Sequence, residues 1–262
     1  MAKNRLDILM VERGLAVSRS LAQRLIMAGQ VRVNGQVALK ASDQVELGSE
    51  IHLDSGPKYV SRGGEKLEAA LSAFGLETIR DWVCVDVGSS TGGFTDCLLQ
   101  HGAAKVYAVD VGYGILHWKL RQDERVVLME RTNARHVNGF PEVIQLVTVD
   151  ASFISLKILL PVIRGWLEDH LLQWPNPQVV ALIKPQFEAG RQDAAKGDGV
   201  IRDAAIHQRV IEEIEEFARQ QGFGVQGIIR SPLTGPKGNV EFLLHLILGA
   251  ADGPQLPLAE IV

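Results

Sequence analysis

The feature that most constrains the fold is a regular alternation of short apolar runs with amphipathic segments from residue 82 onward. Seven runs have the composition of buried strands, and they lie at 82–87, 105–109, 126–129, 146–149, 179–183, 223–229 and 241–248. Helical spacing of apolar residues is clearest over 92–99 and 203–221. Continuous apolar strands that alternate with helices indicate a parallel sheet covered on both faces. The sequence therefore predicts an α/β fold with a doubly wound, seven-stranded, Rossmann-like sheet.

The N-terminal part has a different pattern and a different charge. Residues 1–40 contain seven Lys or Arg against two acids, a balance of +5, so the total charge of −4 leaves −9 on the other 222 residues. Two short helices at 5–13 and 19–28, and a hairpin turn at Asn34-Gly35, predict a small α+β domain. A basic domain on an acidic body favours an anionic partner, with nucleic acid first; a merely solvated basic face is the alternative.

The order of residues in this domain resembles that of the α-L RNA-binding domain. The resemblance rests on the run from Arg5-Leu-Asp through Ser18-Arg19 to Gly29-Gln-Val-Arg-Val-Asn34-Gly35. It implies binding of structured RNA by the second helix and the adjoining turn. The residues at the matching positions are Lys3, Arg5, Ser18, Arg19 and Arg24. Contacts of this kind reach phosphates, which position an RNA without reading its sequence. A domain that has lost RNA binding is the alternative.

Composition and punctuation predict the domain boundaries and the compartment. Ser55-Gly56-Pro57 breaks the pattern, so we expect an N-terminal domain at 1–56, a linker at 57–62, a second domain at 63–250 and a tail at 251–262. Two cysteines, Cys84 and Cys97, do not make a disulfide framework. No uncharged apolar run reaches the ~18 residues that a membrane span needs, and the start lacks the apolar core of a secretory signal. We expect a cytoplasmic protein with no membrane partner.

The turn after the first predicted strand has the character of a cofactor loop. A dinucleotide fingerprint requires glycine at 90, where Ser90 stands. A carboxylate just before the first glycine instead favours a cofactor with an ammonium group and no phosphates, namely S-adenosylmethionine. The expected contacts in the loop are Asp86, Gly88, Ser89, Ser90, Gly92, Gly93 and Phe94. Asp110, after the second strand, is positioned to accept hydrogen bonds from two ribose hydroxyls. An empty nucleotide fold is the alternative.

Four ionic residues lie at the ends of predicted strands. Lys66 precedes the first strand, Asp150 and Lys184 end the fourth and fifth, and Glu241 begins the last. Strands four and five should flank strand one, and an antiparallel last strand begins at the same edge, so the four side chains should converge. Charges at buried strand ends are unfavourable unless paired. For any one of them, a surface cap or a structural ion pair is the alternative.

This set resembles the Lys-Asp-Lys-Glu tetrad of the FtsJ-like ribose 2′-O-methyltransferases, and with the N-terminal domain the whole chain resembles the TlyA family. The resemblance includes Val60-Ser-Arg-Gly-Gly, Glu130-Arg-Thr-Asn133 and Lys184-Pro-Gln-Phe187. It implies S-adenosylmethionine-dependent 2′-O-methylation of cytidine in ribosomal RNA, within ribosomal subunits and without a metal. FtsJ-type enzymes usually carry an acid after the third strand to contact the adenine. Asn133 occupies that region here, and we assign it this role because its amide can hydrogen-bond an adenine edge.

The same resemblance suggests roles for the tetrad. Lys184 is the candidate for deprotonating or orienting the 2′-hydroxyl, and Lys66 and Glu241 would hold Lys184 and the ribose in position. Asp150 would steer the lysine and the methyl-bearing sulfonium, and in-line alignment would supply much of the rate. Two loops, at 190–198 and at 231–238 with Lys237, are expected over the site. Two other functions stay open: a membrane-active haemolysin, and an RNA-binding assembly factor with a vestigial cofactor pocket.

Overall fold

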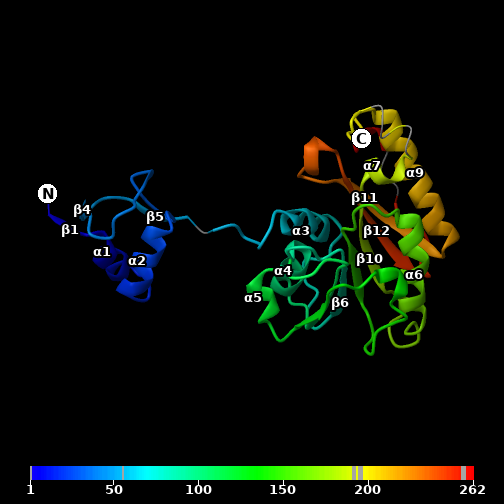
Figure 1. Cartoon of the computed structure of the whole chain (residues 1–262), viewed down its shortest axis with the longest axis horizontal. Coiled ribbons are helices and arrows are strands. Elements are labelled where there is room, and N and C mark those ends of the chain that lie inside the picture. Colours follow the sequence, from blue (N-terminus) through cyan, green and yellow to red (C-terminus); the bar gives the residue numbers. More distant parts are fainter. Residues whose placement is uncertain (1, 55, 191–192, 194–196, 255–257) are drawn as a thin grey trace. The chain divides into compact units, whose positions relative to one another are not determined.

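The chain divides into two compact units, residues 1–58 and 59–262 (Figure 1). The computed structural model describes residues 2–54, 56–190, 193, 197–254 and 258–262. The second unit begins earlier and ends later than the sequence predicts. Tyr59, expected in a linker, is 2% exposed and packs in the core of this unit, and Ile261, expected in a tail, also packs in its core. Both ends of residues 59–262 therefore belong to the second unit, because their apolar side chains are buried in its core.

The first unit has a small core under two short sheets. Its elements are β1 (Lys3–Arg5), α1 (Leu6–Glu12), α2 (Arg19–Met27), β2 (Val31–Val33), β3 (Gln36–Val37), β4 (Gln44–Glu46) and β5 (Ile51–Leu53). Strand β1 pairs with β4, and the second sheet has the order β3-β2-β5. The Ser18 hydroxyl accepts a hydrogen bond from the Leu21 amide at 3.2 Å, as an N-cap does. Asn34 and Gly35 both have positive φ, as the tight turn between β2 and β3 requires.

The second unit is a seven-stranded sheet with helices on both faces. Its elements to the middle of the sheet are α3 (Gly63–Ala73), β6 (Val83–Val87), α4 (Gly93–Gln100), β7 (Lys105–Val109), α5 (Trp118–Arg121), β8 (Val126–Met129), η1 (Ala134–His136) and β9 (Leu146–Val149). The rest are α6 (Leu156–Glu168), β10 (Gln178–Ile183), α7 (Pro185–Glu188), α9 (Ala204–Gln220), β11 (Phe223–Arg230), η2 (Pro236–Gly238), β12 (Phe242–Leu248) and η3 (Leu258–Glu260). All seven strands match the sequence prediction to within one residue at either end.

The strand order is β11-β12-β10-β9-β6-β7-β8. Strand β12 runs antiparallel to both of its neighbours, and the other pairs are parallel. One apolar core lies between the sheet and α6 and α9, and the other lies between the sheet and α3, α4 and α5 (Figure 1). The predicted doubly wound α/β fold is therefore confirmed. In the described part of the chain, no helix combines the length and the apolar character that a membrane crossing requires.

The register of the central strands decides where the ionic residues meet. Val87 of β6 lies opposite Val149 of β9, and Ile183 of β10 lies opposite Phe242 of β12. The next residue of β9 is Asp150, the next of β10 is Lys184, and the residue before β12 is Glu241. All three consequently lie at one edge of the sheet, as the sequence predicts. Residues 191–192 and 194–196 of the expected 190–198 loop lie outside the described residues.

Candidate active site

The four ionic residues predicted to converge form two ion pairs. The Lys66 Nζ lies 2.5 Å from Glu241 Oε2, and the Lys184 Nζ lies 2.6 Å from Asp150 Oδ1. Lys184 also donates a hydrogen bond to the Ser152 hydroxyl at 3.0 Å. Both lysine side chains are about nine-tenths buried and the Glu241 side chain is fully buried, whereas Asp150 is 24% exposed. Each buried cation is thus neutralised by its own carboxylate, and Lys66 and Glu241 hold each other rather than Lys184.

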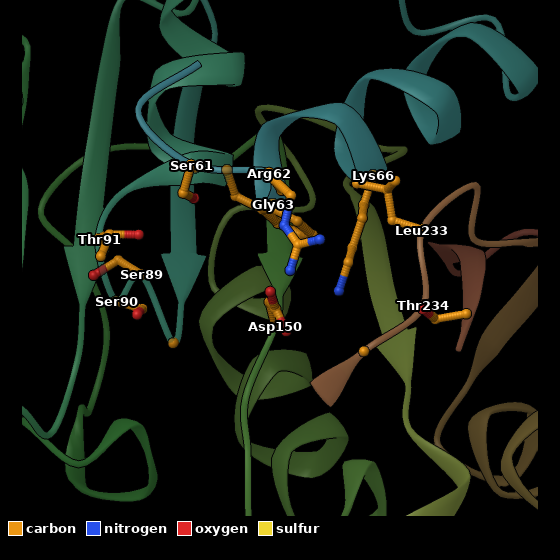
Figure 2. Close-up of a pocket in the computed structure, with 14 residues that line it drawn as sticks. Ser61, Arg62, Gly63, Lys66, Ser89, Ser90, Thr91, Asp150, Leu233 and Thr234 are labelled. Carbon is orange, nitrogen blue, oxygen red and sulfur yellow. The ribbon is translucent and has the colours of Figure 1, made fainter. Parts of the chain in front are cut away.

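A cavity of about 470 Å³ opens beside these pairs, and Lys66 and Asp150 line it. Arg62 lines it too, and Figure 2 shows its guanidinium pointing toward Asp150 and the end of Lys66. Within the described residues Arg62 has no ion-pair partner and no side-chain hydrogen bond. The sequence prediction missed this residue, although it belongs to the Val60-Ser-Arg-Gly-Gly motif that precedes Lys66. The cavity therefore combines two neutralised pairs with one additional positive charge.

The loop before β12 closes the cavity over Glu241. Leu233, Thr234 and Gly235 line this side (Figure 2). A Cβ at Gly235 would lie 2.0 Å from Glu241 Oε1, so a side chain has no room there. The same Oε1 atom is buried, and it has no hydrogen-bond partner among the described residues. Glycine at 235 consequently leaves one carboxylate oxygen of the tetrad with its hydrogen-bonding capacity unused.

The glycine-rich loop between β6 and α4 runs close to its neighbours. Gly88 has φ +83°, and a Cβ there would lie 2.7 Å from the backbone oxygen of Asp150. A Cβ at Gly93 would lie 2.4 Å from the Ser61 hydroxyl oxygen. Ser90 adopts a positive φ of 50°, the conformation that a glycine would supply in a dinucleotide fingerprint. These close approaches place Gly88, Ser89, Ser90, Gly93 and Phe94 on the wall of the first cavity.

A second cavity of about 610 Å³ lies on the other side of this loop. It shares Gly88, Ser90 and Asp150 with the first cavity, and it also contains Asp110 and Asn133. The Asp110 carboxylate accepts hydrogen bonds from the amides of Ser90 at 2.8 Å and Gly112 at 2.7 Å, which fix its orientation. The remaining wall is largely apolar, with Val87, Val109, Val111, Ala134, Ile154 and Leu159. A polar rim on an apolar slot suits a nucleoside.

Two residues on the wall of the second cavity, Asn133 and Phe153, differ in whether the sequence predicted them. Asn133 lines the cavity, while its Oδ1 accepts the Arg135 amide at 3.1 Å and caps the short helix η1. Phe153 was not predicted. It has φ +65° and is 90% exposed, and its ring contacts Phe187 with centroids 5.0 Å apart. No hydrophobic periodicity marks such an exposed ring as part of a site.

Two predicted cofactor residues do not reach either cavity. The Asp86 carboxylate is fully buried, accepts hydrogen bonds from the hydroxyls of Thr95 at 2.6 Å and Thr148 at 3.3 Å, and lines neither cavity. Burial raises its pKa to about 7. The Asp86 carboxylate thus faces Thr95 and Thr148 rather than either cavity, and its contact with an ammonium group stays a prediction. Gly92 is likewise set back, because a Cβ there would lie 2.2 Å from Leu120.

The predicted RNA-facing residues of the first unit divide into two kinds. Arg5 and Arg19 both bond to the buried carboxylate of Asp7, and their side chains are 37% and 54% exposed. Lys3 and Arg24 are exposed on the surface, whereas the Ser18 hydroxyl caps α2. The sequence did not predict that Asp7 holds these two arginines, because a carboxylate in a basic domain carries no motif signal.

The second unit thus defines the class of protein. A doubly wound sheet with a glycine-rich loop after β6, a carboxylate that faces a nucleoside-sized slot after β7 and a lysine–carboxylate cluster at the same edge has the architecture of a class I methyltransferase. Comparison with known proteins gives the particular family. The FtsJ-like methyltransferase family matches residues 59–248, and the S4 domain matches residues 4–51.

Full-length relatives agree with this assignment. The chain is 47% identical to "Putative rRNA methyltransferase YqxC" of Bacillus subtilis, over 99% of this chain and 92% of that protein. It is 44% identical to "16S/23S rRNA (cytidine-2'-O)-methyltransferase TlyA" of Mycobacterium tuberculosis, over 92% of this chain and 89% of that one. A solved structure, "Putative hemolysin from Streptococcus thermophilus", is 44% identical with a TM-score of 0.71, and covers 100% of this chain and 94% of its own. The chain belongs to the FtsJ-like methyltransferases and, among them, to the TlyA family.

Proposed function

We propose that the protein transfers a methyl group from S-adenosylmethionine to the ribose 2′-oxygen of a cytidine in ribosomal RNA. The observation that carries this proposal is the pair of buried lysine–carboxylate contacts, Lys184–Asp150 and Lys66–Glu241, beside a cavity that shares part of its wall with a nucleoside-sized slot. The relatives' names supply ribosomal RNA and cytidine as the substrate. A ribosomal target would place the enzyme in the cytoplasm and its substrate in the ribosomal subunits.

The residues of the two cavities fit the proposed cofactor. Asp110, with both oxygens oriented by backbone amides, would accept the ribose hydroxyls, and the apolar slot beside Asn133 would take the adenine. The backbone of Gly88 and Ser89 and the carboxylate of Asp150 would face the amino-acid end. S-adenosylmethionine supplies an electrophilic methyl group on a positively charged sulfur. Asp86 would support the loop from behind through Thr95, without touching the cofactor.

The ion pairs favour an orienting role for Lys184. An ammonium group only donates hydrogen bonds, so in the pair with Asp150 the Nζ would hold one lone pair of the 2′-oxygen and leave the other aimed at the methyl group, whose bond to sulfur breaks as its bond to oxygen forms. The methylated oxygen is strongly acidic, and its proton would pass to Asp150 or to water. Glu241 would hold Lys66 in position beside the ribose. Most of the rate enhancement would then come from alignment.

Arg62 matches the charge of the proposed substrate. The pairs Lys66–Glu241 and Lys184–Asp150 cancel, so Arg62 leaves the cavity with one unit of positive charge. An RNA phosphate is adjacent to every reactive 2′-oxygen, because the 2′- and 3′-oxygens are on neighbouring carbons. A guanidinium on the same cavity wall is well suited to bind that phosphate through two parallel hydrogen bonds.

The proposal is tested by methyl transfer from labelled S-adenosylmethionine to unmodified ribosomal subunits. The wild-type protein is compared with Lys184→Ala and with the control Lys157→Ala, which removes a lysine of α6 that pairs with Glu213 of α9 and lines neither cavity. We expect a 2′-O-methylated cytidine with the wild type and the control. We expect a loss of at least ~100-fold with Lys184→Ala, the scale on which one transition-state donor acts.

Cofactor binding measured by calorimetry separates the possible failures. Lys184→Ala that still binds S-adenosylmethionine but transfers no methyl group supports the catalytic role of Lys184. Wild-type protein that binds the cofactor and labels neither subunit would overturn the proposed substrate and favour an assembly factor. Labelling of a base, detected by mass spectrometry of nuclease digests, would overturn the ribose chemistry.

A further inference from the structure

The loop that follows β9, residues 150–155, carries residues of both cavities. Asp150 lines both cavities, and every residue from Asp150 to Ser155 lines the second. Ser152 also accepts the hydrogen bond from Lys184. The position of this loop therefore sets the shape of the second cavity and the contact between Lys184 and Asp150.

The short helix α7 contacts this loop near both of its ends. Lys184, at the N-cap of α7, holds the beginning of the loop. At the last position of the helix, Glu188 Oε2 accepts a hydrogen bond from the Ser155 hydroxyl at 2.5 Å, and Glu188 Oε1 accepts one from the Leu156 amide at 2.8 Å. Lys184 and Glu188 thus flank a single helical turn and hold the loop at two points.

The contacts of Glu188 do more than begin helix α6. Ser155 already serves as the N-cap of α6, because its hydroxyl accepts a hydrogen bond from the Lys157 amide at 3.1 Å. Glu188 adds a second acceptor from 32 residues further along the chain. Its carboxylate faces the positive end of α6, where an anion is favoured. Burial nevertheless raises the pKa of Glu188, so the chain retains this carboxylate in an environment that opposes its charge.

We propose that Glu188 is a positioning residue, which fixes the loop 150–155 against α7 and thereby sets both the second cavity and the Lys184–Asp150 pair. The inference rests on the proposed function and deepens it. Glu188 lines neither cavity, so it acts through the loop rather than on the cofactor or the RNA. Pro185, at the first position of α7, restrains the backbone between Lys184 and Glu188, so the two anchoring points move together.

The test compares Glu188→Ala and Glu188→Gln in the full-length protein, at a temperature where circular dichroism shows each variant to be folded. Glu188→Ala removes both acceptors. We expect it to raise the Kd for S-adenosylmethionine about tenfold in calorimetry, the scale of one or two hydrogen bonds. At saturating cofactor and ribosomal subunits, kcat should fall by up to ~100-fold, because the Lys184–Asp150 pair is displaced.

Glu188→Gln tests whether the hydrogen bonds are responsible. The glutamine keeps the size of the side chain and one oxygen for the Leu156 amide, so Kd and kcat should both stay near the wild-type values. A Glu188→Gln variant as impaired as Glu188→Ala would overturn the proposal. So would a folded Glu188→Ala variant with the Kd and kcat of the wild type.

Asp252→Ala is the matched control for a loss of stability alone. Asp252 also accepts a backbone amide, that of Val225 at 2.8 Å, but it does so beside the edge strand β11 and lines neither cavity. It should be less stable and keep the wild-type Kd and kcat. The proposed reaction fails separately: wild-type protein that binds S-adenosylmethionine and labels neither subunit would refute it, while a Kd raised by Glu188→Ala would still support the positioning role.

Discussion

Both units of the molecule pair carboxylates with cationic side chains, but the cations are exposed to different extents. In the first unit, one fully buried carboxylate, Asp7, holds two arginines whose side chains are 37% and 54% exposed. In the second, two carboxylates hold two lysines that are about nine-tenths buried. A charge near solvent is accessible to another molecule, whereas a buried charge can interact only with atoms that enter the cavity beside it. The arginines of the first unit therefore keep part of their donors toward solvent, whereas the lysines of the second unit are enclosed with their carboxylates.

The two fully buried aspartates show how the partners decide the effect of burial. Cationic and amide donors hold the pKa of Asp7 far below its usual range, although burial opposes this. Asp86 has hydroxyl partners, and burial raises its pKa to about 7. The pKa values of these two solvent-inaccessible carboxylates are thus shifted in opposite directions, with the hydrogen bond from Arg5 as the main cause for Asp7 and desolvation as the main cause for Asp86. The predictions below test this contrast.

The largest expected effect comes from breaking a buried pair of the second unit. Glu241→Gln leaves the Lys66 ammonium without its charged partner, so we expect the free energy of unfolding to fall by about 3–5 kcal/mol. Lys66→Met combined with Glu241→Gln should recover much of this stability while methyl transfer stays low. Urea unfolding followed by circular dichroism measures both variants. A double variant that is less stable than Glu241→Gln would contradict the explanation that the unpaired Lys66 charge causes the loss of stability.

Crowding Glu241 without changing its charge tests position alone. Gly235→Ala would place a Cβ 2.0 Å from Glu241 Oε1, so the carboxylate must shift. Displacement of a tetrad member by about 1 Å should lower kcat by up to ~100-fold. Gly165→Ala, in α6 with no atom within 4 Å of the added Cβ, is the control and should keep full activity. Equal kcat values for the two variants would show that Glu241 tolerates movement.

Asp86 should make the second unit less stable as the pH rises. Its folded pKa of about 7 lies above the ordinary value of 3.8, so the stabilisation is complete below pH 3.8 and is lost as the pH approaches 7. The slope should not exceed about 1.4 kcal/mol per pH unit. Asp86→Asn should flatten this part of the curve, and the exposed Asp81→Asn should not. Parallel stability–pH curves for wild type and Asp86→Asn, measured by urea titration, would refute the role.

The smallest expected effect concerns the contact that Arg19 of the first unit is expected to make with an RNA phosphate. Arg19→Ala should reduce the slope of log K against log salt concentration by about 1, as the loss of one neutralised phosphate does. Arg13→Ala is the control, because the Arg13 guanidinium is bonded to the backbone oxygens of Leu47 and Ser49 at 2.7 Å. Filter binding to ribosomal subunits over a salt series gives both slopes. An unchanged slope for Arg19→Ala would show that Arg19 does not neutralise an RNA phosphate.

Position along the strands was enough to predict most of the candidate site. Asp150, Lys184 and Glu241 were recognised because each stands at the end of a buried apolar run, where a charge needs a partner. The glycine spacing likewise predicted a tight loop after the first strand, and Gly88 and Gly93 leave no room for a side chain. Local pattern sufficed in these cases because strand ends and tight turns are properties of short segments.

Pairing and direction could not be predicted in this way. Lys66 is 175 residues from its partner Glu241, and nothing near either residue indicates that they meet. The motif that contains Asp86 correctly marks a carboxylate at a strand end but does not show that it faces Thr95 rather than the cavity. Arg62 and Asp7 lie outside any periodic pattern, so their importance appears only when their neighbours are known.

The sequence by itself therefore determined the seven strands, two of the helices between them, at 92–99 and 203–221, and the edge at which the ionic residues gather, because hydrophobic period and chain punctuation are local. The tertiary structure alone decided which cation pairs with which carboxylate and in which direction burial and partners shift the pKa of each buried aspartate. It also decided which arginines bond to a buried carboxylate while staying partly exposed. These outcomes depend on burial and on contacts between distant segments, and electrostatic free energies in a folded chain are set by both.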